Sequence, residues 1–194
     1  MQRIFARGRR LTLLAVALAA AAAIGGAEAG SVSANGHEFI ASKTGKVTSK
    51  YIGVQTFKTP GGTIECTSVT GTGTISELES PTHKEVLTYT GCTGFGVGIK
   101  ISAAHFEMNA NGSERLEKTV NVTPEGISCE VLIPAQTFEG MKYTNDAGGK
   151  VTAAANVSNI TIKGTGGMCG GESSEASYTG SMKAEIEGGT LEWK

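Results

Sequence analysis

Runs of residues that alternate between apolar and polar, each bounded by a turn signal, recur along nearly the whole chain. In TPGGTIECTSVTGTGTI, residues 59–75, a Pro-Gly-Gly turn comes first. Ile64, Cys66 and Ser68 then occupy alternate positions, so that in a strand they would share one face. Such alternation is typical of a strand with one buried face, because successive side chains leave opposite faces of a sheet. A sustained 3.6-residue apolar pattern is missing after the N-terminal segment. We therefore expect a chain built almost entirely of strands.

Many short strand candidates follow one another, separated by turns such as TPGG, ESPTH, NANGS, TPEG, NDAGG and EGG. This pattern predicts an all-β fold, an antiparallel β-sandwich with a closed or partly open β-barrel as the alternative. We expect a flexible tail over residues 30–36 and a single β domain over 37–194. The predicted strands are HEFIAS, YIGVQTFK, GTIECTSV, TGTIS, EVLTYTG, VGIKIS, HFEMN, LEKTVNV, ISCEVLIP, MKYTN, KVTAAANV, NITIKG, ASYTGSMKAEIE and TLEWK.

The first 29 residues have the pattern of a secretory signal peptide. Four arginines precede an apolar run over residues 11–24, and Ala27 and Ala29 form an A-x-A site, so we expect cleavage between Ala29 and Gly30. The apolar run is shorter than the roughly 20 residues that a spanning helix needs. Arg9 and Arg10 also form a twin-arginine pair, but Thr12 departs from the apolar pattern after it, which favours general secretion. The sequence therefore predicts a secreted or cell-surface protein.

The composition of the predicted mature chain argues against several kinds of partner. Cleavage removes four arginines and Glu28, which changes the formal net charge from −1 to −4 and leaves Arg115 as the only arginine. Nucleic-acid-binding proteins carry a basic stripe, and none is present. No later stretch is apolar enough for a transmembrane helix. We expect no nucleic-acid partner and no transmembrane segment in the mature chain, and the partner itself stays unknown, with a cell-envelope component or a glycan as candidates.

Four cysteines, Cys66, Cys92, Cys129 and Cys169, are predicted to form two disulfides. An even number of cysteines in an exported chain favours a disulfide framework, whereas a metal site would need close C-x-x-C pairs. The midpoint of 66 and 92 is residue 79, beside the ESPTH turn, and the midpoint of 129 and 169 lies in NDAGGK. If the strands pair antiparallel about these turns, each pair of cysteines meets. We expect no metal site.

The motifs GGTIECTSVTGTGTI, LTYTGCTGFGVGIKIS, SCEVLIPAQ, MKYTND, VTAAANVSNITI and ASYTGSMKAE, in this order, resemble a group of uncharacterised exported all-β proteins of soil actinobacteria. That group has the motif order TVxCT, YxGCTAFG, C-x-V-x-VPxQ and YTGS after an export signal. Many of its members have further cysteines near a GC-x-Y segment, but the corresponding SAAHFEMNANGS has none. This departure supports pairing the four cysteines among themselves. The resemblance implies no catalytic residue.

Groups that commonly carry catalysis are few. Asp146 is the only aspartate and sits in a turn, and no G-x-S-x-G elbow is present. We interpret the three histidines as solvated or hydrogen-bonded, with His83 in a turn and His37 and His105 near strand starts. The glycine-rich segments GFGVG and GTGGMCGGESS join strand to strand without the helix of a phosphate loop, so we expect no cofactor.

Two pairs of glutamates, Glu77 with Glu79 and Glu185 with Glu187, are each spaced to share a sheet face. A glycosidase uses two carboxylates about 5–10 Å apart. In SMKAEIEGG, however, the apolar residues take the inward parity, which favours solvated glutamates. A carbohydrate platform needs planar aromatic side chains, and the candidates are scattered: Tyr51, Tyr89, Tyr143, Tyr178 and Trp193.

The sequence thus predicts an exported, non-enzymatic domain that binds a ligand or envelope component through its loops, with no catalytic residue. The alternative is a small secreted, glycosidase-like hydrolase that uses a glutamate pair or a histidine. Two carboxylates converging in a cleft would favour this alternative.

Overall fold

The computed structural model describes residues 36–166, 169 and 171–194, all of which belong to one compact unit. The predicted signal peptide and most of the predicted tail lie outside the described residues. Strands account for nearly all of the regular structure, and the described residues contain no helix. The all-β class predicted from the alternating pattern is therefore confirmed.

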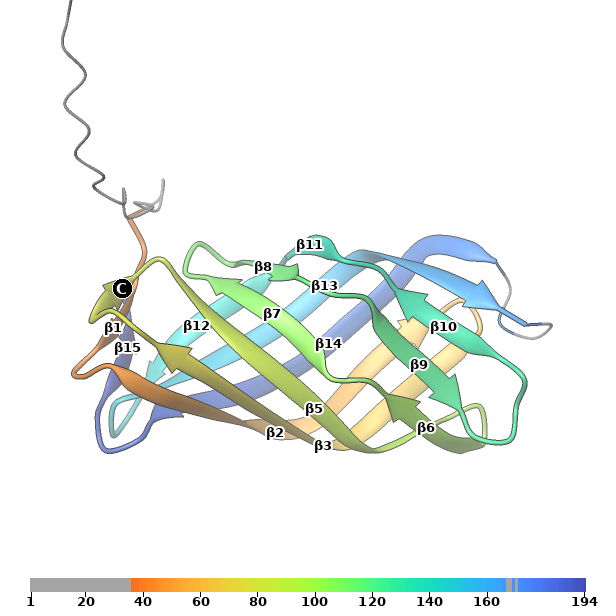
Figure 1. Cartoon of the computed structure of the whole chain (residues 1–194), viewed down its shortest axis with the longest axis horizontal. Helices are drawn as coiled ribbons and strands as arrows, with labels where there is room; N and C mark the ends of the chain where they lie inside the picture. Colours follow the sequence, from red (N-terminus) through yellow and green to blue (C-terminus); the bar gives the residue numbers. More distant parts are fainter. Residues whose placement is uncertain (1–35, 167–168, 170) are drawn as a thin grey trace, which may run out of the picture. The chain divides into compact units, whose positions relative to one another are not determined.

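Eight strands form a closed antiparallel barrel (Figure 1). Each strand pairs with the next in the order β5, β3, β2, β14, β13, β10, β9 and β6, and β6 pairs again with β5. Because the ladder returns to its first strand, the barrel describes this fold better than the sandwich, and the alternative arrangement is the one observed. The strands are Gly45–Thr59 (β2), Gly62–Ile75 (β3), Thr82–Gly94 (β5), Val97–Ile101 (β6), Val120–Pro124 (β9), Glu130–Ile133 (β10), Lys150–Thr165 (β13) and Glu172–Ile186 (β14).

A second set of strands continues the wall along the other half of β5 and β13. It consists of β7 (Ala104–Asn109), β8 (Ser113–Leu116), β11 (Gln136–Glu139) and β12 (Met141–Asp146). The ladder runs from β5 to β7, β8 and β11, whereas β12 pairs with the start of β13. Gly140, between β11 and β12, accepts a hydrogen bond from Asn156, and the Met141 amide donates to the carbonyl of Gly112. The segment 136–146 therefore links the two sides of the wall.

A small three-stranded sheet packs against one end of the barrel (Figure 1). It has the order β15 (Leu191–Trp193), β1 (Phe39–Ala41) and β4 (Glu79–Ser80). Phe39 and Leu191 are fully buried among apolar residues near the starts of β2 and β13 and near the ends of β3 and β14. This sheet acts as an apolar cap, because it removes those side chains and the barrel end beneath them from water.

Several predicted strand boundaries are wrong. Two predicted strands are one continuous β3, and LEKTVNV is divided between β8, which ends at Leu116, and β9, which begins at Val120. The predicted turn ESPTH contains β4 and the first residues of β5. The predicted break after Val157 does coincide with a register shift in β13, where Asn159 has a φ of 59°. Nothing in the alternating pattern predicts β11.

Both predicted cysteine pairs form disulfides. Cys66 of β3 lies directly opposite Cys92 of β5, with a Cα–Cα distance of 3.9 Å, and the register is antiparallel about residue 79 as the midpoint requires. Cys129 is bonded to Cys169, with Cα atoms 5.6 Å apart. The first disulfide links the neighbouring strands β3 and β5. The second links the β9–β10 connection to the β13–β14 connection.

Candidate functional site

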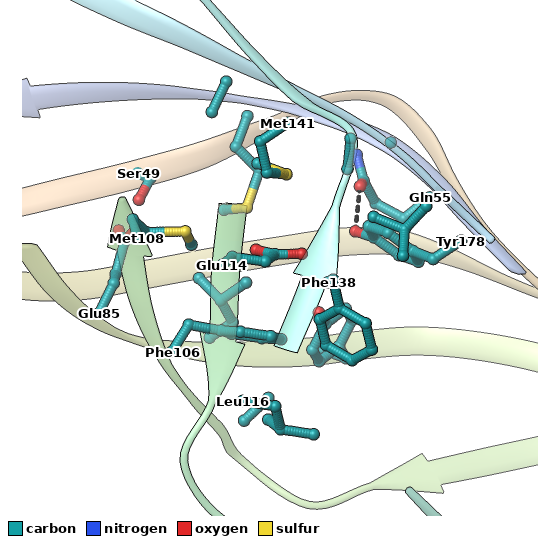
Figure 2. Close-up of a pocket in the computed structure, with 18 of the residues that line it drawn as sticks. Ser49, Gln55, Glu85, Phe106, Met108, Glu114, Leu116, Phe138, Met141 and Tyr178 are labelled. Carbon is teal, nitrogen blue, oxygen red and sulfur yellow. Dashed lines mark hydrogen bonds between the residues drawn. The ribbon is translucent and has the colours of Figure 1, made fainter. Parts of the chain in front are cut away.

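A group of buried polar side chains points into the barrel. Glu85, Glu114 and His83 are only 5%, 6% and 7% exposed, and Ser49 and Tyr143 are buried as well. They come from four strands, β2, β5, β8 and β12. Figure 2 shows Ser49 and Glu85 side by side, with Glu114 reaching into the same space. We call these five residues the lumen cluster.

The alternation of β5 explains how two polar residues come to face inward. His83, Glu85, Leu87 and Tyr89 share one parity, and this parity faces the lumen. In β8 the same rule places Glu114 and Leu116 inside and Arg115 outside. The polar residues face inward because alternate side chains of a strand point to the same face, and their apolar neighbours at alternate positions are buried on the inner face.

Most polar atoms of the lumen cluster have no hydrogen-bond partner in the protein. These atoms are Ser49 Oγ, both ring nitrogens of His83, Glu85 Oε1 and Tyr143 Oη. His83 Nε2 is 3.8 Å from Glu85 Oε2, which is too long for a hydrogen bond. Folded proteins satisfy the large majority of buried polar atoms, and an unsatisfied one costs about 1–3 kcal/mol. Such a concentration of unpaired polar atoms makes the lumen the candidate functional site of the described residues.

Burial also changes the acidity of these groups. Removal from water raises the pKa of Glu114 from 4.5 to about 7, because the charged carboxylate is disfavoured away from solvent. The pKa of Tyr143 is raised by burial first, and then by the charges of Glu114 and Glu85. Glu85, Glu114 and Tyr143 all line the same cavity.

Glycines in the wall make room for the polar side chains. A Cβ atom on Gly71 would collide with the carboxylate of Glu85 and the hydroxyl of Ser49. Glu85 and Ser49 therefore lie against the same point of the wall. Deeper in the barrel, a Cβ on Gly180 would collide with the side chain of Gln55.

A second polar group, Gln55 and Tyr178, is already satisfied by the protein. The Tyr178 hydroxyl donates to Gln55 Oε1 at 2.5 Å, and Gln55 Nε2 donates to the Ser181 carbonyl at 2.9 Å (Figure 2). Burial is also the main cause that raises the pKa of Tyr178. This pair forms one wall of the lumen, and its groups are less available to a ligand than those of the lumen cluster.

The lumen encloses a cavity of about 110 Å³ between these groups. An engineered cavity of about 150 Å³ is large enough to bind benzene. Among the described residues that line the cavity there is no lysine or arginine, and His83 is the only basic one. The apolar part of the lining includes Leu87, Phe106, Met108, Leu116, Phe138 and Val157.

Loops at the uncapped end form a separate groove, where the sequence analysis expected ligand contacts. It has a volume of about 660 Å³ and is lined by turn residues such as Pro60, Phe95 and Ile127. Phe95 is 42% exposed and has a φ of 55°. This groove has no buried polar atom without a partner among the described residues, in contrast to the lumen.

The histidines and the aspartate considered from the sequence have different surroundings. His83, predicted to lie in a turn and to be solvated or hydrogen-bonded, is instead buried in β5 without a hydrogen bond, because its parity faces the lumen. His37 stacks on Trp193, and His105 is half-buried in β7. Asp146 accepts a hydrogen bond from Thr152, which is the main cause that lowers its pKa.

The glutamate pairs considered from the sequence do not converge on a cleft. Glu77, Glu79 and Glu187 are exposed, and Glu185 forms an ion pair with Lys150. Of the scattered aromatic candidates, Tyr89, Tyr143 and Tyr178 line the lumen, while Tyr51 is 40% exposed and Trp193 packs in the cap.

Sequence reasoning missed Glu85 and Glu114. The parity that Glu85 shares with Leu87, and Glu114 with Leu116, is a signal that could have found them. Comparison of the chain with protein-family models, with curated proteins and with solved structures finds no match. The described ranges contain no helix with the length and hydrophobicity needed to cross a membrane.

Proposed function

We propose that this protein is an exported, non-enzymatic binding protein that holds one small ligand in the lumen of its barrel. The observation that carries the proposal is the lumen cluster: buried polar atoms without protein partners border a cavity with largely apolar walls. Ligand sites typically combine apolar walls with a few convergent polar groups. Eight-stranded barrels are also wide enough to hold one small ligand.

The size of the cavity limits the ligand. About 110 Å³ suits a molecule smaller than benzene or close to it in size. A long polymer such as a polysaccharide does not fit inside. A ligand held in the lumen is therefore a small molecule. We place binding there rather than in the loops because the buried polar atoms without partners border the lumen.

Export rests on the N-terminal segment and is supported by the two disulfides, which persist in oxidising compartments. The resemblance to exported actinobacterial proteins points the same way. N-terminal sequencing of protein recovered outside the producing cells tests this part. A mature chain that begins at Gly30 is expected, and intracellular retention with an intact N-terminus would contradict it.

Lumen binding can be tested by recording NMR spectra of the protein in the presence of small amines, alcohols and acids. Each compound should have four to six non-hydrogen atoms. Binding compounds should shift the methyl resonances of Leu87, Met108 and Val157. Gly71→Val, which fills the lumen beside Glu85, should abolish these shifts. Thr72→Val, on the opposite face of the same strand, is the matched control. Shifts confined to outward-facing residues, or undiminished in Gly71→Val, would contradict the proposal.

A second candidate function is hydrolysis, favoured by the convergence of Glu85 and Glu114 on one cavity. Two carboxyl groups that flank the scissile bond are the usual catalytic pair of a glycosidase. Because a nitrophenyl glycoside is larger than this cavity, hydrolysis would require the lumen to open. Release of nitrophenol from an aryl glycoside that is abolished in Glu114→Gln would support this second function. Binding of small molecules without any turnover would favour the first function.

A further inference from the structure

The chemistry of the lumen cluster narrows the class of ligand. We infer that the ligand is a small organic cation, an ammonium group on a short apolar chain, held by Glu85 and Glu114. The inference rests on the proposed function, because it identifies the ligand of the same lumen.

The charges around the cavity favour a cation. Two carboxyl groups face the space, and no lysine or arginine lines it among the described residues. His83 is the one basic lining residue, and it is 3.8 Å from Glu85 at the cap end. An anion would meet both carboxylates. A neutral ligand would provide no counter-charge to these buried carboxyl groups when they are ionised, which is costly in a low-dielectric interior.

The unsatisfied oxygens match the donors of an ammonium group. A primary ammonium has three N–H donors and no acceptor. Glu85 Oε1, Ser49 Oγ and Tyr143 Oη each lack a hydrogen-bond partner and can each accept. Ser49 and Glu85 also lie against the same point of the wall at Gly71, so one nitrogen can approach both.

The remainder of the cavity suits an apolar chain. Glu114 reaches into the lumen between the Ser49–Glu85 pair and the Gln55–Tyr178 pair (Figure 2). Phe106, Leu116 and Phe138 also line the cavity, and their side chains offer no hydrogen bond. A chain of about four carbons fits beside these side chains, with its ammonium group between Glu85 and Glu114.

The affinity should depend on pH. The groups that face Glu114 across the lumen are Glu85, His83, Tyr143, Tyr89 and Tyr178. Since the pKa of Glu114 is about 7, this carboxyl is mostly neutral at pH 5.5 and mostly ionised at pH 8. Loss of this negative charge weakens cation binding, so affinity should fall by roughly thirtyfold from pH 8 to pH 5.5.

Three matched probes test the inference: n-butylamine, 1-butanol and butyrate, titrated into the full mature protein by NMR at pH 8. These probes differ in charge and have similar chains. We expect n-butylamine to bind at least tenfold more tightly than 1-butanol, and butyrate to bind most weakly. Because n-butylamine has only five non-hydrogen atoms, its dissociation constant should be no lower than a few micromolar, from the limit on binding free energy per ligand atom.

The variant Glu85→Gln/Glu114→Gln keeps the shapes of both side chains and should lose the preference for the amine while still binding 1-butanol. The control is Glu107→Gln/Glu117→Gln, which changes outward-facing carboxyl groups in β7 and directly after β8, and it should keep the preference. If the double variant does not fold, Glu114→Gln alone should reduce amine affinity and remove most of its pH dependence.

The outcomes separate the two proposals. Equal or tighter binding of 1-butanol or butyrate, with lumen shifts, would overturn the cation inference and leave lumen binding intact. Binding of none of the three at millimolar concentration would overturn both. An amine preference that survives in the double variant would also overturn the inference, because the carboxylates would then not be its cause.

Discussion

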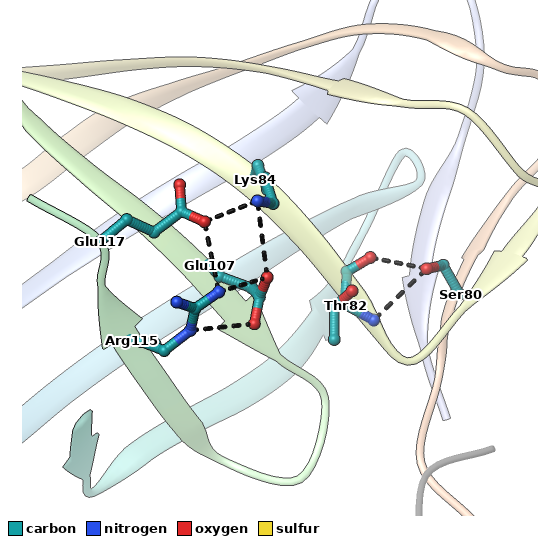
Figure 3. Close-up of polar contacts among 6 residues, drawn as sticks. All are labelled: Ser80, Thr82, Lys84, Glu107, Arg115 and Glu117. Carbon is teal, nitrogen blue, oxygen red and sulfur yellow. Dashed lines mark hydrogen bonds and ion pairs between the residues drawn. The ribbon is translucent and has the colours of Figure 1, made fainter. Parts of the chain in front are cut away.

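The outer and inner faces of β5 and β8 carry charges in opposite ways. On the outside, Lys84 Nζ lies 2.5 Å from Glu117, and Arg115 pairs with Glu107 at 3.0 Å (Figure 3). A further contact between Arg115 and Glu117 joins the pairs into a network. Each carboxylate in this network has a cation beside it, and Lys84 is the main cause that lowers the pKa of Glu117.

At the adjacent position in each strand, the side chain faces inward and, within the described part of the chain, has no lysine or arginine beside it. Glu85 follows Lys84 and Glu114 precedes Arg115, yet both inner carboxyl groups face a space that no lysine or arginine lines among the described residues. The outer network is solvated, and such pairs contribute little to stability. The inner carboxyl groups are buried, and burying a charged group lowers the stability of the fold. The difference teaches that charge inside the barrel does not serve stability, which is why we assign it to ligand binding.

The difference between the inner and outer faces depends on a closed barrel wall. Removing the disulfide in this wall should have the largest effect on the free energy of unfolding. Replacing both Cys66 and Cys92 by serine should lower the free energy of unfolding by about 3–4 kcal/mol, because the unfolded chain regains loop-closure entropy. Chemical denaturation of the oxidised protein and of the variant measures the loss. An unchanged midpoint would show that the barrel does not depend on this bridge.

The inner face should also control the pH dependence of stability. The pKa of Glu114 is about 7 in the folded chain and 4.5 in the reference state, so the folded state binds more protons between these values. Stability should therefore be highest below pH 4.5 as far as this group is concerned, and fall by about 3 kcal/mol as pH rises through 7. Glu114→Gln should flatten this part of the profile, as measured by urea denaturation from pH 4.5 to 8. A profile identical to that of the unaltered protein would refute the assignment.

The smallest effect is expected on the outer face. Glu117→Gln removes a carboxylate from the solvated network and should leave the denaturation midpoint within the error of measurement, since solvent screens such pairs. Added salt should have little further influence. A loss as large as that caused by changes at the inner face would erase the contrast between the two faces.

Parts of this fold could be predicted because they depend on local pattern. The Cys66–Cys92 pair followed from the register of one hairpin, and the burial of Met182, Ala184 and Ile186 followed from parity. The sequence could not decide between a sandwich and a closed barrel, because the contact of β6 with β9 leaves no trace in the alternation of either strand.

The candidate site was missed for reasons that the strand boundaries explain. The predicted strand EVLTYTG begins at Glu85, which left His83 in a turn. The predicted strand LEKTVNV begins at Leu116, which left Glu114 outside any strand, although β8 ends at Leu116. In both strands a polar residue at the strand start shares the parity of its apolar neighbours, and a polar residue at that place is usually read as part of a turn.

The most direct test of the account is the pKa of Glu114 itself, measured by NMR titration of carboxyl-labelled glutamate in the free protein. The structure predicts one glutamate with a pKa of about 7, assigned to residue 114 by its loss in Glu114→Gln. Its pKa should fall when n-butylamine is added, because a bound cation stabilises the carboxylate. A value near 4.5 that does not respond to the amine would show that Glu114 faces water, and would contradict a lumen built to bind a cation.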